Sequence, residues 1–139
     1  MGIITIKTPL FVELPRKTKK PKKVWLNMNT YRNLHRFTES ECKKEFFNII
    51  QDKLPKTKFE TIEVAFQIYK CATKAGEIKK LDKSNVYAVL SKYFFDSLVE
   101  NGNLSDDNDQ IIKTETILPT KYLLYGSTEY AEFTIIDQS

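Results

Sequence analysis

The segment "LDKSNVYAVLSKYFFDSLVENGNLSDDNDQ", residues 81–110, predicts one long helix that leads into an acidic turn. Apolar residues occupy nearly every side of the helical wheel, which indicates a helix buried in the core. Gly102 predicts the C-cap of this helix, because glycine commonly closes a helix. A helix of this kind needs a sheet to pack on, and the flanking segments supply the strands.

Alternation of apolar and polar residues predicts strands before and after the long helix. The expected strands cover residues 3–8, 10–14, 22–28, 59–73, 109–119 and 130–137. Thr38, followed three residues later by Glu41, predicts a capping box ahead of a first helix over residues 39–54. We therefore expect a single α/β (α+β) domain over residues 1–139, with a mixed β-sheet and two main helices packed on it.

Composition limits the class of protein. The 139 residues are 41% hydrophobic and 29% charged, which is typical of a globular domain, and no run of eighteen apolar residues predicts a membrane span. The first residues lack the features of a secretory leader, which favours the cytoplasm. Cys42 and Cys71 belong to no metal-binding spacing, and we expect both to be free thiols.

The long helix carries a stripe of polar side chains. At about 100° per residue, Asp82, Asn85, Lys92 and Asp96 fall on one narrow face. Burying such charges costs several kcal/mol unless they are paired, hydrogen bonded or bound to metal. One explanation is structural, with a Lys92–Asp96 ion pair and Asp82 as the N-cap. The other is a functional site.

The turn after the helix contains Asp106, Asp107 and Asp109. Such a cluster is common in solvated turns, where aspartate side chains accept backbone hydrogen bonds. Magnesium also prefers carboxylate oxygens and keeps several waters. If the fold brings this turn back toward Asp82, the two ends of the helix together would form a magnesium site.

Basic residues cluster in two segments. Six of the eight residues in "RKTKKPKK", residues 16–23, are basic, and a second group of lysines ends just before the long helix. The first segment fits a solvated loop, but both suit phosphate contacts. The candidate DNA-binding residues are Arg16, Lys17, Lys19, Lys20, Lys22, Lys23, Arg32, Lys79, Lys80 and Lys83.

These residues carry a resemblance to the RusA-type Holliday-junction resolvases of phages and prophages. The resemblance covers roughly residues 24–118 and combines a D-x-x-N, a K-x-x-x-D and a D-D element. The matching positions are Asp82, Asn85, Lys92, Asp96, Leu98, Gly102, Asp106 and Asp107. A looser N-terminal match runs through Asn29, Tyr31, Arg32 and His35. His35, the only histidine, fits either a hydrogen-bonded structural role or a base or ligand.

The resemblance implies a homodimeric, Mg²⁺-dependent endodeoxyribonuclease that cuts four-way DNA junctions by paired nicks, with Mn²⁺ as a substitute. It implies metal binding by Asp82 and Asp107, with Asp106, and a catalytic role for Lys92. It further implies a bacterial cytoplasmic setting, with a phage or prophage gene as one origin. The family commonly has D-x-D-N where this chain has Ser84 in the third position. The alternative is a junction- or DNA-binding protein of the same fold without catalytic activity.

Overall fold

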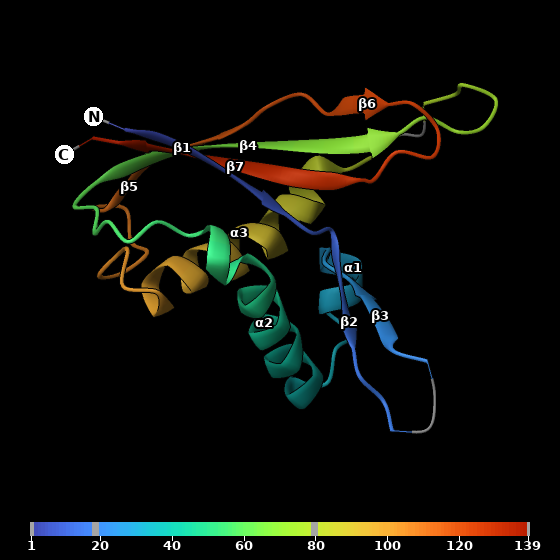
Figure 1. Cartoon of the computed structure of the whole chain (residues 1–139), viewed down its shortest axis with the longest axis horizontal. Coiled ribbons are helices and arrows are strands. Elements are labelled where there is room, and N and C mark those ends of the chain that lie inside the picture. The colour runs from blue at the N-terminus through green and yellow to red at the C-terminus, as the bar shows by residue number, and fades with distance from the viewer. Residues whose placement is uncertain (1, 18–19, 79–80, 139) are drawn as a thin grey trace.

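The computed structural model describes residues 2–17, 20–78 and 81–138 (Figure 1). The described strands are β1 (Ile3–Thr8), β2 (Phe11–Leu14), β3 (Lys22–Trp25), β4 (Ile62–Cys71), β5 (Ile112–Ile117), β6 (Lys121–Leu123) and β7 (Tyr130–Asp137). The described helices are α1 (Met28–Tyr31), α2 (Arg36–Ile50), the 3₁₀ turn η1 (Gln51–Lys53) and α3 (Lys83–Glu100). This mixture of strands and two main helices confirms the predicted α+β class.

The main sheet has five strands in the order β1-β7-β4-β5, and β6 also pairs with β4. β4 is antiparallel to β7 but parallel to β5 and β6, so the sheet is mixed, as predicted. Figure 1 shows α2 and α3 on one face of this sheet. Because β4 and β5 are parallel, α3 must carry the chain back from the end of β4 to the level of its start.

The core lies between this sheet and the helices. β4 buries every second side chain from Ile62 to Ile68, as its alternating sequence predicts. Phe133 of β7 stacks on Phe94 of α3 with ring centroids 4.0 Å apart, and its centroid lies 4.9 Å from that of Phe66. Burial of one such aromatic ring contributes about 1.5–3 kcal/mol to folding. The buried side chains form one continuous hydrophobic core.

Helix α3 is buried in the core along one broad face, as predicted, but it is not buried on every side. Tyr93, Phe94 and Leu98 are fully buried, but Lys92 and Val99 on the opposite side are exposed. The helix packs on the sheet with one broad face and meets α1 and α2 only in part, which leaves an outer stripe in solvent. Neither α3 nor any other helix in residues 2–17, 20–78 and 81–138 is long and apolar enough to span a membrane.

The ends of α3 follow from its sequence. Asp82 is the N-cap, as predicted, and its carboxylate accepts a hydrogen bond of 3.1 Å from the backbone N–H of Asn85. At the other end Asn101 is the C-cap, one residue before the predicted Gly102. Gly102 follows with φ +83°, a left-handed conformation in which glycine avoids a side-chain clash. The backbone N–H of Asn103 then donates to the carbonyl of Leu98 at 2.8 Å, which closes the helix.

Helix α2 begins earlier than predicted. His35 is its N-cap, because its Nδ1 accepts a hydrogen bond of 3.2 Å from the backbone N–H of Phe37. Thr38, the predicted cap, lies inside the first turn, so the predicted capping box with Glu41 is wrong. The single histidine therefore has the structural role that was one of its two interpretations.

The two cysteines are free thiols, as predicted. Cys42 is one of the buried residues of α2, and Cys71 is partly buried at the end of β4. Burial raises the pKa of the Cys42 thiol to about 11, which leaves it protonated at neutral pH.

Strands β2 and β3 form a separate antiparallel hairpin, the arm, which projects away from the main sheet (Figure 1). One face of the arm buries Val12, Leu14 and Val24, and β2 contacts α2. The predicted strand over residues 22–28 ends at Trp25, because Asn27 caps the short helix α1 by accepting a hydrogen bond from Thr30. The other face of the arm is in solvent.

Replacement of two tyrosines of α3 by phenylalanine is expected to change stability in opposite directions. The hydroxyl of Tyr93 is buried without a hydrogen-bond partner among the described residues, whereas the hydroxyl of Tyr87 donates to Glu115. Tyr93→Phe is expected to raise the free energy of unfolding by about 1 kcal/mol, because it removes an unsatisfied polar group. Tyr87→Phe is expected to lower it by a similar amount. Urea denaturation measures both, and a loss of stability in Tyr93→Phe would contradict the assignment.

Candidate functional site

The predicted catalytic residues are spread along the whole of α3. Asp82 precedes its first turn, Lys92 lies in the middle, and Asp106 and Asp107 follow its last turn. A helix of 18 residues is about 27 Å long at 1.5 Å per residue. Because β5 is parallel to β4, the turn before β5 stays at the far end of the sheet from Asp82. The expectation that Asp82 and Asp107 of one chain share a cation is therefore wrong.

The acidic turn is held by its own side chains. Asp106 accepts hydrogen bonds from the backbone N–H of Asp107 at 2.8 Å and from the side-chain amide of Asn108 at 3.1 Å. The hydrogen bond from the Asp107 N–H lowers the pKa of Asp106. Burial is the largest cause that raises the pKa of Asp107, and the contact with Asp106 is the second. The charge of Asp96 also raises the pKa of Asp107.

Metal ligands do not converge in the part of the chain that the structure describes. No group of three or more His, Cys, Asp or Glu side chains there has the arrangement of a metal site. Magnesium binds through one or two carboxylates together with waters and substrate oxygens, so a pair of aspartates is a sufficient protein donor set. Asp106 and Asp107, which are in contact in the acidic turn, form such a pair.

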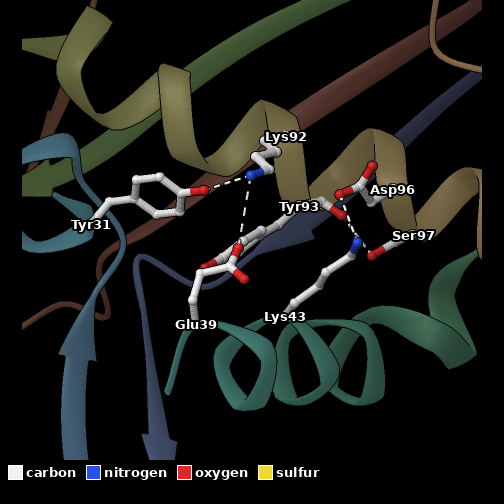
Figure 2. Close-up of polar contacts among 7 residues, drawn as sticks. All are labelled: Tyr31, Glu39, Lys43, Lys92, Tyr93, Asp96 and Ser97. Carbon is white, nitrogen blue, oxygen red and sulfur yellow. Dashed lines mark hydrogen bonds and ion pairs between the residues drawn. The ribbon is translucent and has the colours of Figure 1, made fainter. Parts of the chain in front are cut away.

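Lys92 is held by two neighbouring helices (Figure 2). Its Nζ donates a hydrogen bond to the hydroxyl of Tyr31 and lies 3.8 Å from a carboxylate oxygen of Glu39. The bond to Tyr31 is the largest cause that raises the pKa of Lys92, and Glu39 adds to it, so the side chain stays positively charged. About half of the side chain remains exposed. Lys92 thus presents a fixed cation to solvent beside α1, and Glu39 is a partner that the sequence prediction missed.

Asp96 pairs with α2 and not with its own helix. Figure 2 shows Lys43 reaching from α2 to Asp96, and the two groups are 3.0 Å apart. The alternative of a Lys92–Asp96 ion pair within α3 is therefore wrong, although the Asp96 charge still acts on Lys92. Beside this contact, Lys43, Lys44, Phe47 and Ser97 line a pocket of about 300 Å³ between the helices.

The predicted DNA-binding residues lie mainly on the arm. Lys17, Lys20, Lys22 and Lys23 are exposed there, and Arg16 lies 3.5 Å from Glu41 of α2. Arg32 is exposed after α1, and Lys83 is partly buried in the first turn of α3. Lys19, Lys79 and Lys80 lie outside the described residues.

Ser84 and Asn85, the other predicted site residues, stand in the first turn of α3. Ser84 is exposed and Asn85 partly buried, and the Asn85 backbone takes part in the cap at Asp82. This end of the helix therefore offers the single carboxylate of Asp82, with Ser84 in solvent beside it.

Comparison with known proteins assigns no family to the chain. The sequence matches no protein-family model, and no curated protein is significantly similar to it. The resemblance to RusA-type resolvases therefore stays a prediction from the residue pattern through Asp82, Lys92 and Asp107.

The raised pKa of Asp107 predicts how its replacement changes stability with pH. A carboxyl whose pKa is higher in the folded state favours folding at low pH, and this contribution is lost as pH rises and the group ionises. Asp107→Asn is therefore expected to match wild type near pH 3, as both side chains are then neutral, and to be more stable than wild type at pH 7. Urea denaturation at both pH values tests this, with Asp109→Asn as the control for net charge. An equal effect of Asp107→Asn at both pH values would contradict it.

Proposed function

We propose that the chain is a metal-dependent endodeoxyribonuclease of the RusA type that acts as a homodimer on four-way DNA junctions. One observation carries the proposal: Asp82 and Asp107 flank a single helix whose middle presents the cation of Lys92. The same residues carry the family pattern in the sequence. A charged stripe in this position has no role in the core, since Lys92 and its neighbours on the stripe lie outside it.

A homodimer with a two-fold axis brings together the acidic groups that lie far apart within one chain. Two copies related by such an axis perpendicular to α3 run their helices antiparallel, so Asp82 of one copy can lie beside Asp106 and Asp107 of the other. Each dimer then has two composite acidic sites, in keeping with two nicks in opposed strands. The carboxylate oxygens of both copies fit the ligand preference of magnesium, which when bound polarises a phosphate and activates water.

The chain's own cations have separate roles in this proposal. Lys92 stabilises negative charge on the phosphate at the composite site, because its hydrogen bond to Tyr31 fixes its position and its charge. The exposed lysines of the arm contact phosphates further away and release counterions, which supplies affinity without reading sequence. The proposed partner is therefore branched DNA, with the arm on the duplex and α3 near the scissile bond.

Mixing two inactive variants tests the composite site. Asp82→Asn and Asp107→Asn are each expected to abolish cutting of a labelled synthetic four-way junction in magnesium or manganese. Refolded as a mixture, they should recover about a quarter of the wild-type sites, because half of randomly paired dimers contain one intact site. The recovered product is a single nick and not a resolved junction, which gel electrophoresis separates.

The control is a mixture of Asp82→Asn with Lys92→Ala. In antiparallel dimers, recovery in that mixture shows that Lys92 acts at the site that holds the acidic turn of its own chain. No recovery shows that Lys92 acts at the site that holds Asp82 of its own chain. A mixture of Asp82→Asn and Asp107→Asn that stays inactive, while wild type cuts, would contradict a site shared between chains.

The second candidate is a junction-binding protein without catalytic activity. It is favoured by Ser84, which stands where the family commonly has a carboxylate, so that the first turn of α3 adds no acid to the N-cap Asp82. In this case the arm lysines would still hold branched DNA.

Ser84→Asp separates the two candidates. If the protein is a nuclease, this variant should cut four-way junctions as well as wild type or better, because it adds a carboxylate next to Asp82. Ser91→Asp, which adds the same charge further along α3, is the matched control and should give no gain. If wild type and Ser84→Asp both bind junctions and leave them uncut with either metal, catalysis is discarded and the binding function is kept.

A further inference from the structure

The outer face of the arm carries the only tryptophan of the chain. Trp25 ends β3 and is 39% exposed, although a side chain of this size is usually covered. Its cross-strand neighbour is Phe11, and the two ring centroids are 5.1 Å apart. The pair forms a small aromatic face on the solvent side of the arm, while Val24 between Lys23 and Trp25 points into the core.

Two lysines lie over these rings. The Nζ of Lys23 is 4.0 Å from the ring centroid of Phe11 and 4.5 Å from that of Trp25, and the Nζ of Lys70 is 5.7 Å from Trp25. Lys70 also pairs with Glu129 at 3.1 Å. In the part of the chain that the structure describes, Lys23 has no ion pair within 4 Å, although Glu13 is its partner in the strand register. We name Phe11, Lys23, Trp25 and Lys70 the Trp25 surface.

A pocket continues this surface toward the main sheet. It has a volume of about 390 Å³, and its lining includes Phe11, Lys7, Lys53 and Tyr130. The Nζ of Lys7 lies 4.6 Å from the ring centroid of Tyr130, so the far side of the pocket repeats the pairing of lysine with an aromatic ring. Thr8, which also lines the pocket, is buried, and its hydroxyl has no hydrogen-bond partner among the described residues. The volume is large enough for one planar ring.

We propose that the Trp25 surface and this pocket bind unpaired nucleotides of a single-stranded nucleic acid. Aromatic faces stack on any base, because every base has a π-face, and lysines beside the stack neutralise the phosphates between bases. The flexible stem of Lys23 allows its ammonium group to move from the rings to a phosphate as a base arrives. The inference rests on the proposed function only in taking nucleic acid as the partner, and it requires neither metal nor cleavage.

An acidic peptide is the competing occupant, since lysines attract carboxylates as well. The ring faces of Trp25 and Phe11, tilted by 58° to each other, favour a base, because carboxylate side chains gain nothing from stacking on rings. DNA and RNA strands share bases and phosphates, so either could supply the ligand, and the experiment distinguishes them.

Tryptophan fluorescence measures the proposed contact directly, because Trp25 is the only tryptophan. In EDTA, a twelve-residue oligo(dT) strand is expected to quench this emission with a saturable curve, whereas a blunt duplex of equal length quenches it less at equal occupancy. Oligo(rU) in the same assay tells whether RNA binds as tightly as DNA. A twelve-residue polyglutamate should leave the emission unchanged.

Labelled oligo(dT) and anisotropy then test the variants. Trp25→Ala should weaken strand binding at least about fivefold, as the loss of one stacked base implies, and Trp25→Phe should recover part of it. Lys23→Gln should lower the slope of log affinity against log salt by about 0.7, the value for one phosphate of a single strand. Lys113→Gln, a lysine on β5 at the other end of β4, is the matched control and should leave the affinity unchanged.

Three results would overturn the inference. The first is saturated strand binding without a change in Trp25 emission. The second is equal affinity of wild type and Trp25→Ala, with circular dichroism showing that both are folded. The third is quenching by polyglutamate that matches quenching by oligo(dT), which would assign the surface to acidic peptides. None of these results depends on whether four-way junctions are cut, so failure here is distinct from failure of the proposed nuclease.

Discussion

The place of α3 in the chain, as the connection between two parallel strands, is the constraint on which the rest of this structure depends. Parallel neighbours must be joined by a segment that returns along the whole sheet, and α3 makes that return between β4 and β5. Stacking of Phe94 on Phe133 fixes the face of the helix that is buried. The polar stripe is then necessarily outward, and its two acidic ends are necessarily far apart.

That outward stripe explains how charges on an apolar helix are tolerated. Lys92 and Asp96 do not pair with each other, but each meets a group from α1 or α2 at the edge of the core. Exposed ion pairs of this type contribute at most about 1 kcal/mol each, so they cannot be what holds the helices together. Their effect is positional, because they fix where a cation and a carboxylate face solvent, and this is the property that a phosphate-binding site needs.

The sequence predicts those parts of the fold that depend on local periodicity. The alternation in β4 and the Asp82 cap are local features, and both are confirmed. The degree of burial of α3 does not depend on local sequence alone. A helix with apolar residues on all sides is partly exposed whenever its neighbours cover only one face. The cap of α2 is His35 and not the predicted Thr38, and it lies only four residues after the end of α1 at Tyr31. The separation of Asp82 from Asp107 follows from the order and direction of the strands in the sheet. The periodicity of apolar residues does not reveal this order.

The arm shows how an exposed aromatic surface can be kept in place without being buried. A two-stranded hairpin is marginally stable alone, so Val12, Leu14 and Val24 must pack against the body of the protein to order it. Helix α2 supplies that contact, and the same helix holds Asp96 through Lys43. Because α2 contacts both the arm and the polar stripe of α3, it fixes their positions relative to each other.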